Sequence, residues 1–156
     1  MKSFVCVSLP TRFVCVVNAM DEKLRKKVFD LAAKVRREIE KRDSLTGWPS
    51  RDLCGYCGIA SARLSQVFKI EKIPHVIAMR NTVMLSHVYL IVEDHVVDIT
   101  ATQFSEFTGQ RIVILHSKEA EVHYFYGADK QFKSAIELRK HQLRTGWPEE
   151  QVADAL

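Results

Sequence analysis

Two short apolar runs on either side of a two-residue gap constrain the fold most. The runs are HVYLIV, residues 87–92, and HVVDIT, residues 95–100, and both are rich in β-branched side chains. Segments of this length and composition are typical of β-strands, and a two-residue connection such as Glu93-Asp94 is that of a tight hairpin. The pattern therefore predicts an antiparallel pair in which the first residue of one run lies near the last residue of the other.

The rest of the chain predicts helices on both sides of an antiparallel meander. Helical spacing of apolar residues predicts helices over residues 21–43, 57–68 and 129–143. Further strand-like runs are HVIAM (75–79), RIVIL (111–115) and EVHYFY (121–126). Two helices, a meander and a last helix give an α+β fold. A chain of 156 residues fits one domain, and we treat residues 1–20 as an N-terminal extension of it.

Composition narrows the choice of partners. The net charge of +4 is mild and its basic residues are interspersed with acidic ones, so we expect no nucleic acid partner. No apolar run reaches the length that spans a bilayer, so we expect no membrane partner. Four irregularly spaced cysteines predict no disulfide framework, which favours a reducing, cytoplasmic location. The apolar start is split by Pro10 and Arg12, and secretion as an effector remains the alternative.

The segment Cys-Gly-Tyr-Cys, residues 54–57, admits three kinds of chemistry. A thioredoxin-like dithiol follows a buried strand, whereas Gly47 and Pro49 mark the preceding segment as a loop. A zinc site needs two ligands besides Cys54 and Cys57, and no histidine pair stands at the usual finger spacing. The third interpretation is a thiol nucleophile, and we prefer it.

Cys57 is placed to be that nucleophile because the second apolar helix pattern begins with it. The unpaired N–H groups and the positive dipole end of a helix N-terminus favour a thiolate. Gly55 and Gly58 would let the backbone approach a substrate closely. A cysteine taken alone is more often an inert buried thiol, so the assignment needs a base and an orienting acid nearby.

His87 and Asp98 are the candidates for that base and that acid. His87 begins one strand of the predicted hairpin and Asp98 lies near the end of the other, which brings them together by diagonal proximity. Taken singly, His87 would be a satisfied core histidine and Asp98 a residue of a strand-end turn. Taken with Cys57, they predict a catalytic triad.

Two segments resemble the transglutaminase-like branch of the papain-like cysteine enzymes. In GYCGIASARLSQVFKIEKIPHVIAM, residues 55–79, Gly-x-Cys opens a helix and Ile-Pro leads into a strand. SHVYLIVEDHVVDIT, residues 86–100, has the branch's order of His, strand, turn, strand and Asp, and the ATQF that follows is similar to that of small bacterial and phage-type members. The resemblance implies that Cys57 is the nucleophile, His87 the general base and acid, and Asp98 the orienting acid. It also implies a papain/transglutaminase-like core, with the nucleophile helix packed on an antiparallel sheet.

The sequence departs from the family pattern at the oxyanion hole. Arg51 stands six residues before Cys57, where papain-type enzymes place a glutamine. The backbone N–H of Cys57 would be one oxyanion donor. Candidates for the second donor or for substrate binding are Trp48, Tyr56, Asn81 and Gln103.

Three other features have less specific interpretations. Cys54 is structural or incidental, although oxidation could join it to Cys57 in a disulfide. We place His95 in the hairpin turn and expect it to face solvent. Trp48 and Trp147 are interpreted as core or loop anchors.

The resemblance implies acyl transfer from an amide or peptide bond through a thioester, with a peptide or protein as substrate and no metal or cofactor. We prefer hydrolysis, as by a peptidase, an amidase or a glutamine deamidase, because small members of the branch are mostly hydrolytic. Three alternatives stay open: a transglutaminase that joins glutamine to an amine, a catalytically silent peptide- or protein-binding module of the same fold, and a zinc-bound structural module.

Overall fold

The computed structural model describes residues 19–46 and 53–153, with side chains described except for residues 43–46. The helices of this part are α1 (Glu22–Thr46), α2 (Cys57–Ile70), α3 (Ser117–Ala120) and α4 (Ala135–Arg144). The strands are β1 (Val76–Asn81), β2 (Ser86–Val92), β3 (His95–Asp98), β4 (Val113–His116) and β5 (Lys130–Phe132). Short 3-10 turns are η1 (Ala101–Gln103), η2 (Ser105–Phe107) and η3 (Glu149–Gln151).

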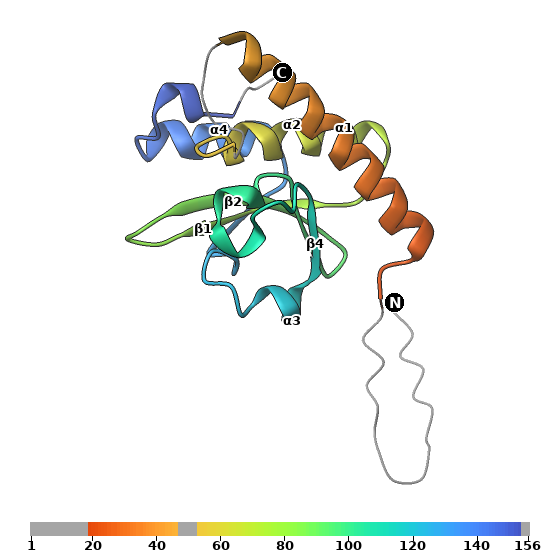
Figure 1. Ribbon diagram of the computed structural model, residues 1–156. Coiled ribbons are helices and arrows are strands. Elements are labelled where there is room, and N and C mark those ends of the chain that lie inside the picture. The colour runs from red at the N-terminus through yellow and green to blue at the C-terminus, as the bar shows by residue number, and fades with distance from the viewer. Residues whose placement is uncertain (1–18, 47–52, 154–156) are drawn as a thin grey trace, which may run out of the picture.

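The strands form one sheet in the order β4-β3-β2-β1-β5, and each neighbouring pair is antiparallel. Helices α1, α2 and α4 lie on one face of this sheet, and α3 lies on the other (Figure 1). The fold is therefore α+β. Among the described residues, no helix combines the length and the apolar character that crossing a membrane requires.

The central hairpin confirms the register that the sequence predicts. Val92 pairs with His95, so the turn consists of Glu93 and Asp94. Glu93 has a φ of +51°, in the region that tight two-residue hairpin turns use. The predicted start of the second helix at Cys57 is also confirmed, although this helix extends to Ile70.

The prediction of a strand over residues 121–126 is wrong. Backbone bonds from His123 N–H to the Ala120 carbonyl and from Tyr126 N–H to the His123 carbonyl fold this run into turns. Its Phe125 and Tyr126 are buried in an aromatic core beneath the sheet. Aromatic enrichment here reflects burial rather than strand pairing, and the fifth strand is β5, which pairs with β1.

The last helix begins later than residue 129, the predicted start. Residues 130–132 pair with β1, and the Ser134 hydroxyl accepts a hydrogen bond from Glu137 N–H as the N-cap of α4.

The other differences from the predicted elements are confined to the ends of helices and strands. α1 extends to Thr46 instead of residue 43, and the strands predicted over 75–79, 87–92, 95–100 and 111–115 span 76–81, 86–92, 95–98 and 113–116.

His95 is buried, contrary to the prediction that it faces solvent. It is the first residue of β3, which lies between β2 and β4 in the sheet. Only 4% of it is exposed, and its ring packs edge-on against the ring of His116, its partner on β4, with centroids 5.2 Å apart. The neighbouring strand β4, which follows much later in the chain, is what covers this end of the hairpin.

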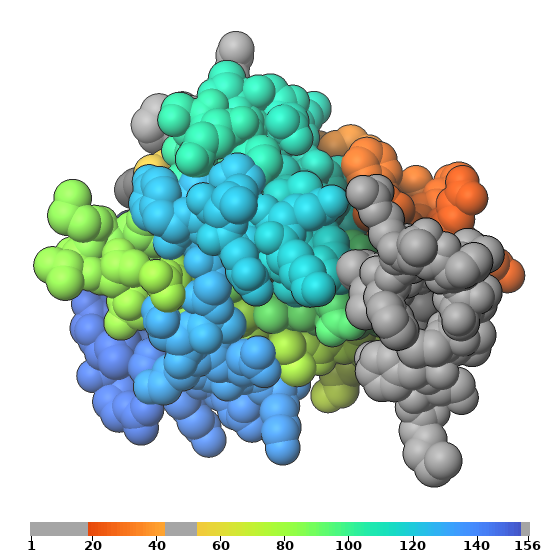
Figure 2. Space-filling view, turned by 90° about the horizontal axis from the view of Figure 1, so that it is seen from below, coloured from red at the N-terminus to blue at the C-terminus, as the bar shows by residue number. Residues whose placement is uncertain are grey.

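Two hydrophobic cores flank the sheet. The first, the upper core, lies between the helices and the sheet and includes Val28, Leu64 and Leu90. The second lies beneath the sheet and is mostly aromatic, with Tyr89 and Phe125 among its members. The segments between β3 and β4 and between β4 and β5 lie over this lower face (Figure 2). The polypeptide therefore covers both faces of the hairpin that carries the candidate base and acid.

A buried arginine ties α1 to this scaffold. Arg36 is 2% exposed and donates to the carbonyls of Ile99 (2.7 Å) and Arg111 (2.8 Å) and to the Thr102 hydroxyl (2.9 Å). It also pairs with Glu40, which the Arg111 side chain contacts as well. Burial opposes ionisation of Glu40, but the two arginines outweigh it and keep the pKa of this carboxyl below its ordinary value.

Replacing Arg36 with alanine should lower the free energy of unfolding by about 3 kcal/mol, because two carbonyls and a carboxylate lose their shared donor. Urea unfolding followed by circular dichroism measures this. Arg37→Ala, an exposed neighbour on the same helix, is the matched control and should change stability by no more than about 0.5 kcal/mol. Equal effects of the two variants would contradict the structural role of Arg36.

Candidate active site

Cys57 is the first residue of α2, and a tight turn leads into it. Tyr56 N–H donates to the Leu53 carbonyl at 3.0 Å, and Ala60 N–H makes the first helical bond, to the Tyr56 carbonyl, at 2.8 Å. The turn needs Gly55, whose φ is +81°. The N–H groups of the first helical residues, Cys57 included, have no acceptor within the helix.

The two glycines that flank this start accommodate the C-terminal segment of the chain. A β-carbon on Gly58 would lie 2.4 Å from Gln142 Nε2, and one on Gly55 would lie 3.2 Å from Gln151 Nε2. The sequence analysis expected the space beside Gly58 to be open for a substrate. Instead, the side chain of Gln142 from α4 fills it. Cys57 is buried, with 3% exposed.

His87 and Asp98 form a buried pair, as the hairpin register predicts. His87 Nε2 lies 2.7 Å from Asp98 Oδ2, and the two residues are 0% and 1% exposed. Three further donors bind the carboxylate: Thr100 N–H (2.7 Å) and the Thr100 hydroxyl (2.9 Å) on Oδ1, and the Tyr126 hydroxyl (2.9 Å) on Oδ2. All of these donors favour the ionised carboxylate.

The electrostatics of this pair favour an imidazolium. Burial lowers the pKa of His87, but the charge and hydrogen bond of Asp98, together with the interaction with Cys57, outweigh it and raise this pKa to about 9. Burial likewise opposes ionisation of Asp98, and the charge of His87 and the Thr100 donors hold its pKa below the ordinary value. Burial and the Asp98 charge raise the pKa of Tyr126, so this phenol stays a donor.

The second ring nitrogen of His87 is the one available to the thiol. Since Asp98 accepts at Nε2, that nitrogen carries a proton and Nδ1 remains for other partners. Cys57 lies close enough to His87 to contribute to the raised pKa of this histidine. The structure therefore brings Cys57, His87 and Asp98 together in the order that the sequence predicts.

Four aromatic side chains enclose the His87 ring, and sequence reasoning did not place Phe104, Phe125 or Tyr126 there. The ring stacks on Tyr89, with centroids 5.7 Å apart, and meets Phe104 edge-on at 4.8 Å. Phe125 and Tyr126 complete the enclosure at 6.3 and 5.9 Å. The only sequence signal for the last two was the aromatic run, which the chain uses in turns rather than in a strand.

Gln103 lies at the His87 ring. Its Nε2 donates to the Thr100 carbonyl at 3.0 Å and lies 3.4 Å from His87 Nδ1. Of the other candidates, Tyr56 precedes α2 and packs partly buried against the core, and Asn81 is exposed and accepts from the Ser86 hydroxyl. Trp48 lies outside the described residues.

The other predicted residues have ordinary surroundings. Cys54 is exposed and Cys57 is buried, and neither forms a disulfide within the part of the chain that the structure describes. Trp147 packs against the upper core, in keeping with an anchor. Within residues 19–46 and 53–153, no group of three or more His, Cys, Asp or Glu side chains gathers where a metal ion could be held.

Comparison of the chain with protein-family models, with curated proteins and with solved structures gave no match.

Replacing Asp98 with asparagine should lower the pKa of His87 from about 9 to below the ordinary value of about 6.5, because burial then acts without the opposing charge. An NMR titration of the imidazole nitrogens measures this. Asp94→Asn, which removes an exposed carboxylate from the turn of the same hairpin, should leave the titration unchanged. A His87 pKa that is the same in the wild type and in Asp98→Asn would refute the charge coupling.

Proposed function

We propose that the protein is a cysteine-dependent acyl-transfer enzyme that hydrolyses an amide or peptide bond. The observation that carries this proposal is that Cys57 lies beside a buried histidine whose Nε2 is bound to Asp98. Thiol, imidazole and carboxylate in this order supply a nucleophile, a proton carrier and an orienting group. The resemblance to the transglutaminase-like branch supports the same assignment, and a papain/transglutaminase-like core is part of the proposal.

In the first half of the reaction, the thiolate of Cys57 attacks the substrate carbonyl carbon. The carbon–nitrogen bond breaks as His87 gives its Nδ1 proton to the departing amine, which leaves a thioester on Cys57. Asp98 holds the ring and stabilises its charged form, as the raised pKa of His87 requires.

In the second half, neutral His87 takes a proton from water, and the resulting hydroxide equivalent attacks the thioester. The carbon–sulfur bond breaks, and a carboxylic acid leaves as the thiolate and the imidazolium re-form. The backbone N–H of Cys57, at the start of α2, is one donor to the oxyanion in both halves. A reduced thiol suits the proposed cytoplasmic location.

Two alternatives are retained. In a transglutaminase, a lysine amine would replace water in the second half, and the first half would be unchanged. A silent peptide- or protein-binding module is favoured by one specific observation: Cys57 is 3% exposed, so a substrate reaches the thiol only after a local movement.

Thiol reactivity separates an activated cysteine from an inert one. At pH 7, iodoacetamide should alkylate buried Cys57 about tenfold faster than exposed Cys54, because the proposed mechanism pairs its thiol with the His87 imidazolium. His87→Ala should abolish this advantage, and His75→Ala, which removes a half-buried histidine bound to Ser65, should preserve it. Reactivity that follows exposure, with Cys54 labelled first, would count against an activated thiol.

Activity itself can be screened with a library of peptides containing glutamine and asparagine, read by mass spectrometry for cleavage, deamidation or attachment of an added amine. We expect products that Cys57→Ala abolishes, and a rate that falls as the pH rises through about 9, where His87 loses the proton it must donate. Amine attachment in place of hydrolysis would identify the transglutaminase alternative. Peptide binding that is equal in the wild type and in Cys57→Ala, without any product, would establish the silent module.

A further inference from the structure

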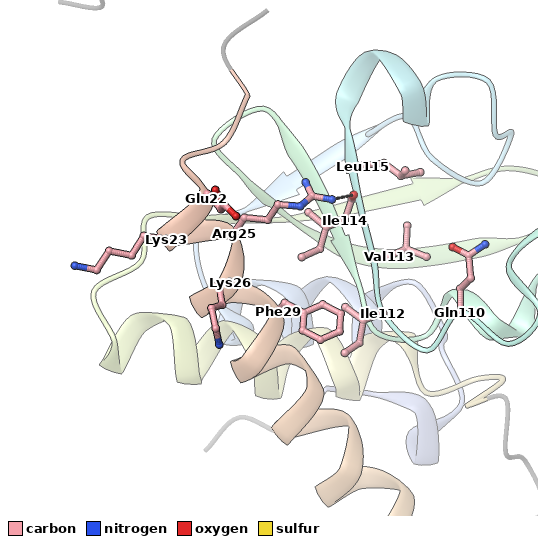
Figure 3. A pocket seen from close by; sticks show the side chains of 10 residues that line it. All are labelled: Glu22, Lys23, Arg25, Lys26, Phe29, Gln110, Ile112, Val113, Ile114 and Leu115. Atoms are coloured by element: carbon pink, nitrogen blue, oxygen red, sulfur yellow. Dashed lines mark hydrogen bonds between the residues drawn. The ribbon is translucent and has the colours of Figure 1, made fainter.

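A groove of about 900 Å³ opens between α1 and β4 (Figure 3). Its apolar lining comes from Phe29 of α1 and from the segment around β4, and Phe29 is 48% exposed there. The residues that line it are Glu22, Lys23, Arg25, Lys26, Phe29, Gln110, Ile112, Val113, Ile114 and Leu115. None of these residues belongs to the candidate active site.

One wall of the groove is the edge of the sheet. β4 is the last strand in the sheet order and pairs only with β3 among the described strands. Arg25 Nη2 donates to the Ile114 carbonyl at 3.1 Å, so this carbonyl points away from β3. The N–H and C=O of one residue in an antiparallel strand point the same way, and the Ile114 N–H therefore also faces the groove. Such an edge is a template for a further strand.

The chain that precedes α1 reaches the described part of the protein at this groove. Met20 is 5% exposed and belongs to the upper core, which fixes the chain just before the helix. α1 runs antiparallel to β4, since Arg25 meets Ile114 while Arg36 meets Arg111, which precedes β4. A segment that ran alongside β4 in the same direction would thus end where α1 begins.

The residues that precede α1 in the sequence have the composition of a strand. RFVCVV, residues 12–17, lies outside the described residues and is rich in β-branched and aromatic side chains. Five extended residues span about 16 Å, enough to follow the four residues of β4. The interval 18–21 is long enough for a turn into the helix.

We propose that Phe13–Val17 adds to β4 as a sixth, parallel strand and fills this groove. The Ile114 N–H then gains an acceptor, and one face of the added strand, with Phe13, Cys15 and Val17, covers the exposed part of Phe29. This intramolecular docking does not depend on the proposed enzymatic function.

Two measurements on the full chain test the docking. In hydrogen–deuterium exchange, the amides of residues 112–116 should exchange about tenfold faster in Phe13→Glu than in the wild type, because the added strand is lost. In alkylation, Cys15 should react about tenfold more slowly than Cys6, which lies outside the proposed strand. Phe29→Glu should remove this difference, and this half-exposed site tolerates the change without loss of the fold.

Lys34→Glu is the matched control, because it places the same side chain on an exposed site of α1 that does not line the groove, and it should behave as the wild type. The proposal would be overturned if Phe13→Glu left the exchange of the amides of residues 112–116 unchanged and Cys15 reacted as fast as Cys6. Protection that disappears on dilution would assign the groove to a second copy of the chain and would also overturn it.

Discussion

The buried charge of Asp98 is the constraint on which the rest of the site depends. A carboxylate that is 1% exposed costs several kcal/mol unless donors and an opposite charge compensate it. Four donors do so here, from His87, Thr100 and Tyr126. They come from β2, from the turn after β3 and from the segment beneath the sheet, so these three parts must be in place together.

This requirement explains why the site draws on both sides of the sheet. Cys57 belongs to the core between the helices and the sheet, and Tyr126 belongs to the aromatic core beneath it. The aromatic enclosure of His87 keeps water from the pair, which strengthens the attraction between imidazolium and carboxylate. Cys57 is itself only 3% exposed, so burying the ionic pair and opening the thiol to a substrate are competing demands in this fold.

Sequence patterns predicted the parts of the structure that local chemistry decides. Glu93-Asp94 between two β-branched runs gave the register that joins His87 to Asp98, and the apolar helix pattern gave the start of α2 at Cys57. Residues whose environment is made by distant segments were not predictable in this way. His95 is covered by β4, and Arg36 bonds to carbonyls more than 60 positions away. Tyr126 joins the site only because its aromatic run turns under the sheet.

The separations along the chain imply an order of assembly. His87 and Asp98 are 11 positions apart and share one hairpin, whereas Cys57 and His87 are 30 positions apart (57 to 87). Closing the longer loop costs about 0.9 kcal/mol more in chain entropy, and two-residue hairpins form within microseconds. We therefore expect the hairpin to bring the ionic pair together early in folding, and the thiol to join it when α2 docks on the sheet.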